Sequence, residues 1–382
     1  MGSNPPFIGR TVKAAVLRWL RPQRVVLLKG ARRTGKTELA RQIQQEFEGR
    51  CDFLNAEDMD TRNLLADQSV RNYRNLFGQT DLLIIDEAQV IPDIGLMVKL
   101  IADEVKGVRI LLTGSSSLTL TQSTGEPLTG RKTDLELYPF SMEELRGGWS
   151  GVELRKQLTD RILYGSYPEV VFMEHPQDRK IYLKEILRSY LLKDVLMLNE
   201  LRETDKLRKL LQLLAWQLGQ EVSLQELGNT LGMSKNTVER YMELMWDAYV
   251  IFPLSGYQKN LRKEVAKSKK WYFCDTGIRN AIIGDFKPME LRPDAGALWE
   301  NFVITERLRQ HRMNLRDTAL YFWRTYDRQE VDLIEEDEDG LRAFELKWRL
   351  PSKKVKPPLG FAKAYPEAAF EVVHGENWYE YL

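Results

Sequence analysis

A glycine-rich stretch in residues 27–40 restricts the fold of this chain more than any other part of the sequence. It contains the pattern GxxxxGKT between an apolar run and a helical pattern. Gly30 and Gly35 permit backbone conformations that are closed to other residues, so that consecutive N–H groups can converge on phosphates. We therefore predict a phosphate-binding loop that joins a buried strand to a helix.

The side chains at the end of this loop suit a nucleotide and its metal ion. Lys36 would reach the β- and γ-phosphates, and Thr37 would place its hydroxyl on Mg²⁺. The helix that starts there would direct its unpaired N–H groups and its positive dipole end to the same anions. The predicted nucleotide-binding residues are Gly30, Ala31, Arg32, Arg33, Thr34, Gly35, Lys36, Thr37 and Glu38.

A continuous apolar run over residues 82–85 ends in two carboxylates, Asp86 and Glu87. Such a run is typical of a strand in a parallel sheet that is buried on both faces. At its C-terminal end Asp86 would hold Mg²⁺, usually through water, and Glu87 would orient and polarise an attacking water. The alternative is that both carboxylates only cap the following turn.

Another buried strand, expected over residues 108–113, ends in small hydroxyl residues. P-loop ATPases with an extra strand between the P-loop strand and the acidic strand carry a polar γ-phosphate sensor here, which Thr113 or Ser115 would provide. For Ser115 a helix N-cap is the alternative. Arg131 is a candidate arginine finger for a neighbour's nucleotide, and a surface salt bridge is its alternative.

The remaining pattern predicts further elements on both sides of these motifs. We expect helices over 11–20 and 60–77, strands over 25–28 and 51–54, and a mostly helical region over 152–218. Residues 221–242 have the spacing of a helix-turn-helix, in which Ser223 and Ser234 would be N-caps and Gly232 would supply the turn.

The second helix of that motif would present polar side chains suited to phosphates and base edges, namely Lys235, Asn236, Thr237 and Arg240. A wing hairpin should follow over 259–270, where six basic residues stand against one acidic residue: Lys259, Arg262, Lys263, Lys267, Lys269 and Lys270. The formal net charge of the chain is only +1, so any DNA-binding surface must be local. A protein-docking or merely solvated wing is the alternative.

Near the C-terminus, Asp332, Glu345 and Lys347 have the D…ExK spacing of metal-dependent nucleases. In those enzymes two carboxylates on adjacent strands hold Mg²⁺, and the lysine positions or activates a water. The strands would cover 330–334 and 341–348 across an acidic turn, 335–340, and Glu300 on a preceding helix would be an extra acid. A valine, Val331, precedes Asp332 where the nuclease pattern has a proline. Because ExK is a short pattern, charged residues on exposed strands would also produce it by chance.

Together these motifs resemble prokaryotic AAA+-type ATPases that carry a conserved C-terminal domain of unknown function, DUF4143. The resemblance implies an ATP-hydrolysing core, a winged-helix module and a C-terminal fold similar to restriction endonucleases, but no substrate. It rests on residues 30–37, 85–89, 112–116, 130–131 and 137–141, and extends through 164–171, 192–195 and 272–277.

We therefore expect an α/β protein with four parts. These are an AAA+ P-loop ATPase domain with a parallel sheet (1–150), a helical connector (151–220), a winged helix (221–285) and a PD-(D/E)xK nuclease-like domain (286–382). The leading hypothesis is a DNA-dependent ATPase that uses ATP and Mg²⁺, forms a hexameric ring and acts on DNA, including branched DNA such as Holliday junctions. An ATP-gated nuclease and a nucleotide-controlled protein-interaction module are the alternatives. The lack of a long apolar run predicts a cytoplasmic location.

Overall fold

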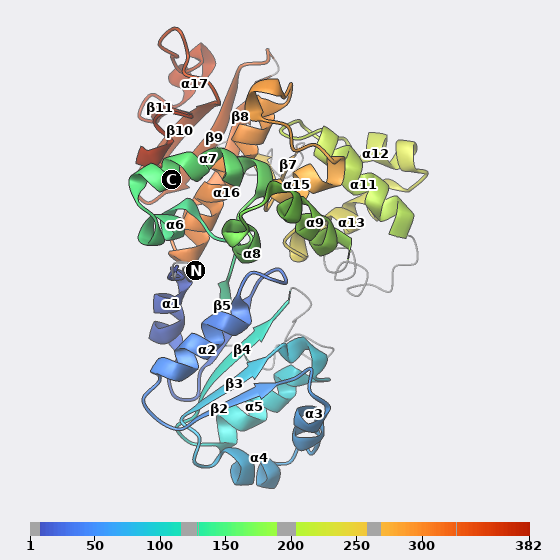
Figure 1. The fold of residues 1–382 in the computed structure, drawn as a ribbon, viewed down its shortest axis with the longest axis vertical. Coiled ribbons are helices and arrows are strands. Elements are labelled where there is room, and N and C mark those ends of the chain that lie inside the picture. Colours follow the sequence, from blue (N-terminus) through green and yellow to red (C-terminus); the bar gives the residue numbers. More distant parts are fainter. Residues whose placement is uncertain (1–7, 116–127, 129, 189–203, 258–268, 326) are drawn as a thin grey trace. The chain divides into compact units, whose positions relative to one another are not determined.

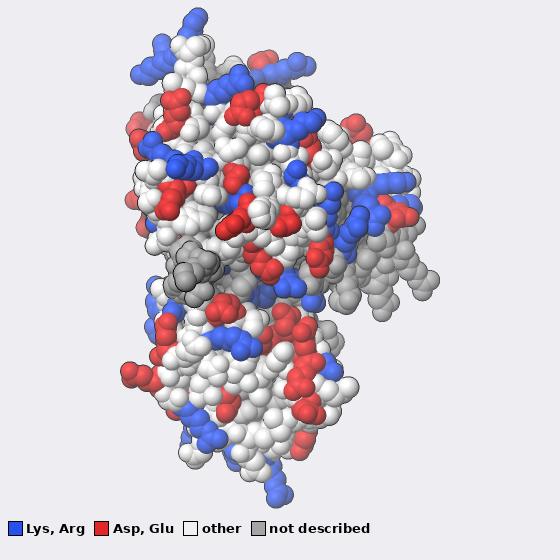
Figure 2. Space-filling view, in the orientation of Figure 1, with Lys and Arg blue, Asp and Glu red and all other residues white. Residues whose placement is uncertain are grey.

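The computed structural model describes residues 8–115, 128, 130–188, 204–257, 269–325 and 327–382 (Figure 1). The chain divides into two compact units, the first ending at Phe140 and the second running from Ser141 to Leu382. In the face drawn in Figure 2, acidic and basic side chains are interspersed over both units. Among the helices described, none is both long and apolar enough to cross a bilayer.

Five parallel strands form the sheet of the first unit, in the order β2-β3-β4-β1-β5. β4 lies between β1, which precedes the P-loop, and β3, which ends in Asp86. This order confirms the predicted P-loop ATPase sheet with its extra strand. The strands are β1 (Val25–Lys29), β2 (Cys51–Asn55), β3 (Leu82–Asp86), β4 (Arg109–Gly114) and β5 (Lys132–Glu136).

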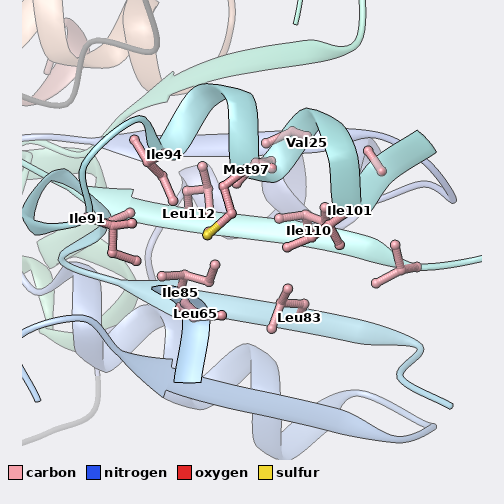
Figure 3. Close-up of a cluster of buried hydrophobic side chains, with 14 of the residues drawn as sticks. Val25, Leu65, Leu83, Ile85, Ile91, Ile94, Met97, Ile101, Ile110 and Leu112 are labelled. Carbon is pink, nitrogen blue, oxygen red and sulfur yellow. The ribbon is translucent and has the colours of Figure 1, made fainter. Parts of the chain in front are cut away.

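Both faces of this sheet are covered by helices, as the apolar run of β3 predicted. Leu83 and Ile85 point into one core with residues of α3, α4 and α5 (Figure 3), while Leu82 and Ile84 point into the other with α1 and α2. Each of these side chains stabilises the fold by about 1.5–3 kcal/mol through burial. The helices are α1 (Val12–Trp19), α2 (Lys36–Glu46), α3 (Met59–Ala66), α4 (Val70–Phe77), α5 (Ile94–Glu104) and the 3₁₀ turn η1 (Ala88–Val90).

The single helix expected over 60–77 is wrong, because the chain breaks into α3 and α4. Ser69 adopts an extended conformation, and its hydroxyl accepts a hydrogen bond from the Asn72 N–H over 3.2 Å. A serine at this position starts a helix because its side chain replaces the missing backbone acceptor.

A six-stranded mixed sheet, in the order β11-β10-β9-β8-β6-β7, organises the second unit. β6 pairs antiparallel with β7 and parallel with β8, so strands from the expected winged-helix part and from the expected nuclease-like part share one sheet. The strands are β6 (Ile251–Gly256), β7 (Lys270–Phe273), β8 (Ala319–Arg324), β9 (Glu330–Asp337), β10 (Gly340–Lys347) and β11 (Ala369–His374). The acidic turn is shorter than expected, because β9 extends to Asp337.

The helix-turn-helix prediction is confirmed by two helices, α12 and α13. The Ser223 and Ser234 hydroxyls cap them, and Gly232 adopts a left-handed conformation with φ of +62° between them. The helices of this unit are α6 (Met142–Gly148), α7 (Gly151–Tyr164), α8 (Pro168–Phe172), α9 (Pro176–Ile186), α11 (Thr204–Trp216), α12 (Leu224–Leu231), α13 (Lys235–Asp247), α15 (Thr276–Ile283), α16 (Ala295–Met313) and α17 (Leu359–Ala364), with 3₁₀ turns η3 (Met289–Leu291) and η4 (Trp378–Glu380).

A buried ion pair joins α16 to the sheet. Glu335 on β9 is fully buried, and Arg307 donates to its two oxygens over 2.5 and 2.6 Å, while the His311 ring lies 3.0 Å away. Burial alone would raise the pKa of Glu335, but the hydrogen bonds from His311 and Arg307 outweigh it and lower the pKa from 4.5 to about 2. The charged form is therefore the native form.

We expect Glu335→Gln to destabilise the protein by about 3 kcal/mol at pH 7. Because the folded-state pKa is depressed, this stabilisation is present above about pH 5 and is lost as the pH falls through the folded value near 2. Chemical denaturation between pH 3 and 7 measures it. Glu338→Gln, in the exposed turn of the same hairpin, is the matched control; equal stability of the two variants at pH 7 would contradict the prediction.

Candidate functional site

Asp86 joins residues from three neighbouring strands at the carboxyl edge of the parallel sheet. The Thr37 hydroxyl donates to Asp86 Oδ2 over 2.8 Å, and the Thr113 hydroxyl donates to Asp86 Oδ1. Thr37 lies in the first turn of the helix after β1, and Thr113 lies near the end of β4. Asp86 is only 3% exposed, so both hydroxyls compensate the loss of water around its charge. The structure thus brings the predicted metal-binding pair and the candidate sensor together.

The loop before α2 has the geometry of a phosphate cradle. Gly35 is left-handed with φ of +95°, and a Cβ on Gly30 would lie 2.2 Å from the Leu137 carbonyl oxygen, so both positions require glycine. The Lys36 ammonium lies within the loop, 3.1 and 2.9 Å from the carbonyl oxygens of Gly30 and Ala31. This donor set fits a nucleotide's phosphates, with Thr37 and Asp86 as ligands for its Mg²⁺.

The other predicted loop residues differ in exposure. Thr34 is buried and its hydroxyl donates to the Ala31 carbonyl over 2.9 Å, which closes the loop on itself. Arg33 is exposed and left-handed, with φ of +65°, whereas Arg32 is half-buried. Glu38 is exposed in the first turn of α2.

Arg10 supports this loop, and sequence analysis missed it. Its Nη1 donates to the Thr34 carbonyl over 2.9 Å, and its Nη2 donates to the Tyr138 carbonyl. The guanidinium also lies over the Phe140 ring, 4.6 Å from the ring centre. A lone arginine before the first helix belongs to no motif, so only its contacts identify it as a brace of the P-loop.

Glu87 is held in a fixed position next to Asp86. Its backbone is left-handed, with φ of +53° and ψ of +40°, a conformation that costs a non-glycine residue on the order of 1–3 kcal/mol and is concentrated at functional sites. Gln89 donates from Nε2 to Glu87 Oε2 over 2.5 Å, and its Oε1 accepts from the Ser115 N–H over 3.3 Å. Gln89, for which no role was predicted, therefore links the second carboxylate to the end of β4.

Arg131 lies at the amino ends of the strands, whereas the P-loop of the same chain lies at their carboxyl ends. Its carbonyl accepts from the Val25 N–H at the start of β1, so the length of β1, about 15 Å, separates it from the loop. Its guanidinium forms an ion pair with Asp103, close to the end of α5. The structure thus contains the salt bridge that was the alternative interpretation, and a role on a neighbour's nucleotide stays a prediction.

The D…ExK residues converge in the second unit. The Lys347 ammonium lies 2.5 Å from Glu345 Oε1 and 3.9 Å from Asp332 Oδ2, and Asp332 also accepts from the Leu346 N–H over 2.8 Å. Burial, followed by the charges of Glu300 and Glu345, raises the pKa of Asp332 from 3.8 to about 7. Lys347 is therefore paired with these carboxylates, and within the described ranges no three acidic, His or Cys side chains form a metal-binding group.

Lys270 belongs to the same cluster, which corrects its assignment to a DNA-binding wing. Its side chain is 2% exposed, and its ammonium lies 2.5 Å from Glu330 Oε1 and 3.2 Å from Glu300 Oε1. Glu300 also accepts a hydrogen bond from the Tyr272 hydroxyl. A buried ammonium that is paired with two carboxylates cannot face a phosphate backbone.

The other expected DNA contacts are placed as follows. Lys235, Asn236 and Arg240 are exposed on α13, and Lys269 is exposed beside β7. Thr237 instead completes the helix cap, since its N–H donates to Ser234 Oγ over 3.1 Å and the two hydroxyl oxygens lie 2.8 Å apart. The remaining basic residues lie outside the described part of the chain: Lys259, Arg262, Lys263 and Lys267.

Three family models match successive parts of the chain. An AAA domain matches residues 22–146, a domain of unknown function, DUF8612, matches 155–288, and another, DUF4143, matches 295–381. The first match covers the P-loop, Asp86 and Arg131, and the last covers the D…ExK residues. The helix-turn-helix over 221–242 lies within the DUF8612 match, so each of the three matched domains contains one of the motifs identified in the sequence.

Proteins similar over most of the chain occur in bacteria and archaea. An uncharacterized protein of Mycobacterium tuberculosis is 31% identical over 342 residues, which cover 88% of this chain and 73% of that protein. An uncharacterized protein of Methanocaldococcus jannaschii is 26% identical over 315 residues, covering 76% of this chain and 67% of that protein. Among solved structures, the Walker-type ATPase PABY2304 of Pyrococcus abyssi matches with a TM-score of 0.48 and 15% identity, over 74% of this chain and 99% of that one.

We expect Gln89→Ala to lower the rate of ATP hydrolysis by roughly tenfold to a hundredfold, because the Glu87 carboxylate loses the contact that fixes it. ATP affinity should stay unchanged, since Gln89 bonds to neither the loop nor Asp86 in the described contacts. Steady-state turnover and equilibrium binding of ATP separate the two effects. Gln45→Ala, on the exposed face of α2, is the control; unchanged turnover in Gln89→Ala would refute the positioning role.

Proposed function

Because the chain belongs to the family of prokaryotic AAA-type P-loop ATPases with a DUF4143 domain, we propose that it hydrolyses ATP and that DNA controls this hydrolysis. The observation that carries the first part is the Asp86 carboxylate, which holds the hydroxyls of Thr37 and Thr113 beside the P-loop. Glycines, lysine, hydroxyls and carboxylates are thus combined at one sheet edge, as phosphoryl transfer to water requires.

Each residue has a role that follows from its position. ATP with Mg²⁺ would supply the transferable phosphoryl group and the charge that activates it. Lys36 and the first turn of α2 would bind the phosphates, while Thr37 and Asp86 would hold the metal ion. Glu87 would orient the attacking water and receive its proton, and Thr113 would sense the γ-phosphate through Asp86.

The DNA part of the proposal is supported by the helix-turn-helix. Lys235, Asn236 and Arg240 are exposed at the N-terminal half of α13, where recognition helices contact the phosphate backbone and base edges. Lys269 adds a further exposed positive charge. We propose branched DNA, such as a Holliday junction, as a substrate by analogy with the motors of recombination and repair.

A ring of several copies, with six as the expected number, completes the proposal. Arg131 lies too far from its own P-loop to act there, so any contact with a nucleotide would be made in a neighbouring copy. Its ion pair with Asp103 would then have to exchange for the phosphate. A single arginine finger contributes on the order of 10³–10⁵ in rate in related phosphoryl-transfer enzymes.

The test compares ATP turnover without DNA and with duplex, single-stranded, forked and four-way-junction DNA. We expect at least one DNA form to change the rate, and Lys36→Ala and Glu87→Gln to abolish turnover. The double variant Lys235→Ala/Arg240→Ala should lose the DNA effect, whereas Lys287→Ala, at an exposed lysine outside α13, should keep it. Turnover that no DNA form changes would refute the DNA part, and slow hydrolysis without DNA affinity at low salt would favour the interaction module.

A second candidate function, metal-dependent DNA cleavage gated by ATP, is supported by the convergence of Asp332, Glu345 and Lys347. The burial of Asp332 near Glu300 and Glu345 gathers negative charge where such nucleases hold a divalent cation. Lys347 would then have to leave the carboxylates when the cation binds. The fold alone does not guarantee this activity.

We expect Asp332→Ala to abolish any cleavage that the unmodified protein shows with Mg²⁺ or Mn²⁺, because the cation loses a ligand. Gel analysis of plasmid and junction DNA, with and without ATP, measures it. Glu338→Ala, in the exposed turn between β9 and β10, is the control. Intact DNA under every metal condition would rule out the nuclease.

A further inference from the structure

Three helices of the second unit border a half-open cavity of about 520 Å³ that belongs to neither site described above. α15 contributes its floor with Ala281 and Ile282, and α9 and α11 form its walls. The packing of α15 against both α9 and α11 produces this arrangement, which can be followed in Figure 1. The volume is typical of small-molecule sites, which range over roughly 300–1,000 Å³.

Every charged residue described in the walls is basic. Lys184 and Arg188 come from α9 and the residues directly after it, and Arg208 comes from α11. All three side chains are exposed, and none forms an ion pair or hydrogen bond through its side chain in the described chain. No Asp or Glu is among the described residues that line the cavity.

The lining residues come from α11 and from the end of α9. Arg208 and Gln212 are four residues apart and lie on one face of α11, whereas Lys184 lies in the last turn of α9 and Arg188 follows that helix. Leu187 and Leu211 also line the cavity and add to the apolar surface of the α15 floor. The cavity therefore combines cations at its walls with an apolar base and one amide.

This combination fits a ligand with two chemically different ends. Guanidinium and ammonium groups bind phosphate through charge-assisted hydrogen bonds, and two arginines provide forked donors. An uncharged apolar ligand would contact the base but not the three cations, and free phosphate would contact the cations but not the apolar base. The Gln212 amide both donates and accepts, which suits the polar edge of a base.

We infer that this cavity binds a nucleoside phosphate, as a second nucleotide site separate from the P-loop. The phosphates lie between Arg188 and Arg208, and the planar base lies on the apolar floor. A small ligand is favoured over a nucleic-acid strand because the site is a cavity between three helices and not an open track along one of them. The inference does not depend on ATP hydrolysis, since no residue of the first unit takes part.

The experiment uses the full chain with Lys36→Ala, which weakens binding at the P-loop. Equilibrium binding of fluorescent ATP and ADP is measured, with unlabelled ATP, ADP, AMP, pyrophosphate and a single-stranded oligonucleotide as competitors. We expect saturable binding that remains in Lys36→Ala and weakens at least tenfold when Arg188→Glu and Arg208→Glu are added. Lys209→Glu, an exposed lysine of α11 outside the cavity, should bind as the parent does.

The possible results separate this site from the P-loop. Binding lost in Lys36→Ala alone would place all nucleotide binding at the P-loop and overturn the inference, as would binding that Arg188→Glu/Arg208→Glu leaves unchanged. Stronger competition by the oligonucleotide than by ADP would also overturn it, because the cavity would then bind a strand. The milder pair Arg188→Ala/Arg208→Ala, checked by circular dichroism, keeps the test valid if the charge reversals disturb folding.

Discussion

The functional site of the first unit depends on the hydrogen bonds that the Asp86 carboxylate accepts from two hydroxyls. A buried charge is costly unless it is hydrogen-bonded, and Asp86 is compensated by the hydroxyls of Thr37 and Thr113. These two residues come from successive positions on the same side of β3, because β4 lies between β3 and β1. The same bonds that stabilise the acid therefore align the P-loop helix with the end of β4.

In the second unit, carboxylates are compensated mainly by the ammonium groups of lysines. Its partly buried carboxylates Asp332 and Glu300 are paired with Lys347 and Lys270, and Glu300 also accepts a hydrogen bond from the Tyr272 hydroxyl. A divalent cation would compete with these ammonium groups for the same oxygens. The ion pairs thus set the electrostatic condition for any metal chemistry there, and they stabilise β7, β9, β10 and α16 as one structure.

Basic residues in this protein differ in their surroundings, and the net charge of +1 does not reveal these local differences. Lys270 and Lys269 are neighbours in sequence, yet one is buried in a carboxylate cluster and the other is exposed. Lys184, Arg188 and Arg208, which belong to no motif, line one cavity. The count of basic residues in a segment therefore says less about phosphate binding than the surface on which each residue lies.

The sequence by itself determined the features that depend on neighbouring residues: the P-loop between β1 and α2, the acidic end of β3, and the capped helices α12 and α13. Their signals are local, because glycine conformations, helix caps and apolar runs act over a few residues. Only the tertiary structure decided the contacts between distant segments. It placed Arg10 on the P-loop, Gln89 between Glu87 and Ser115, Lys270 in the carboxylate cluster and Arg131 at the far sheet edge. These contacts follow from strand order and helix packing, which bring together residues that no spacing in the sequence relates.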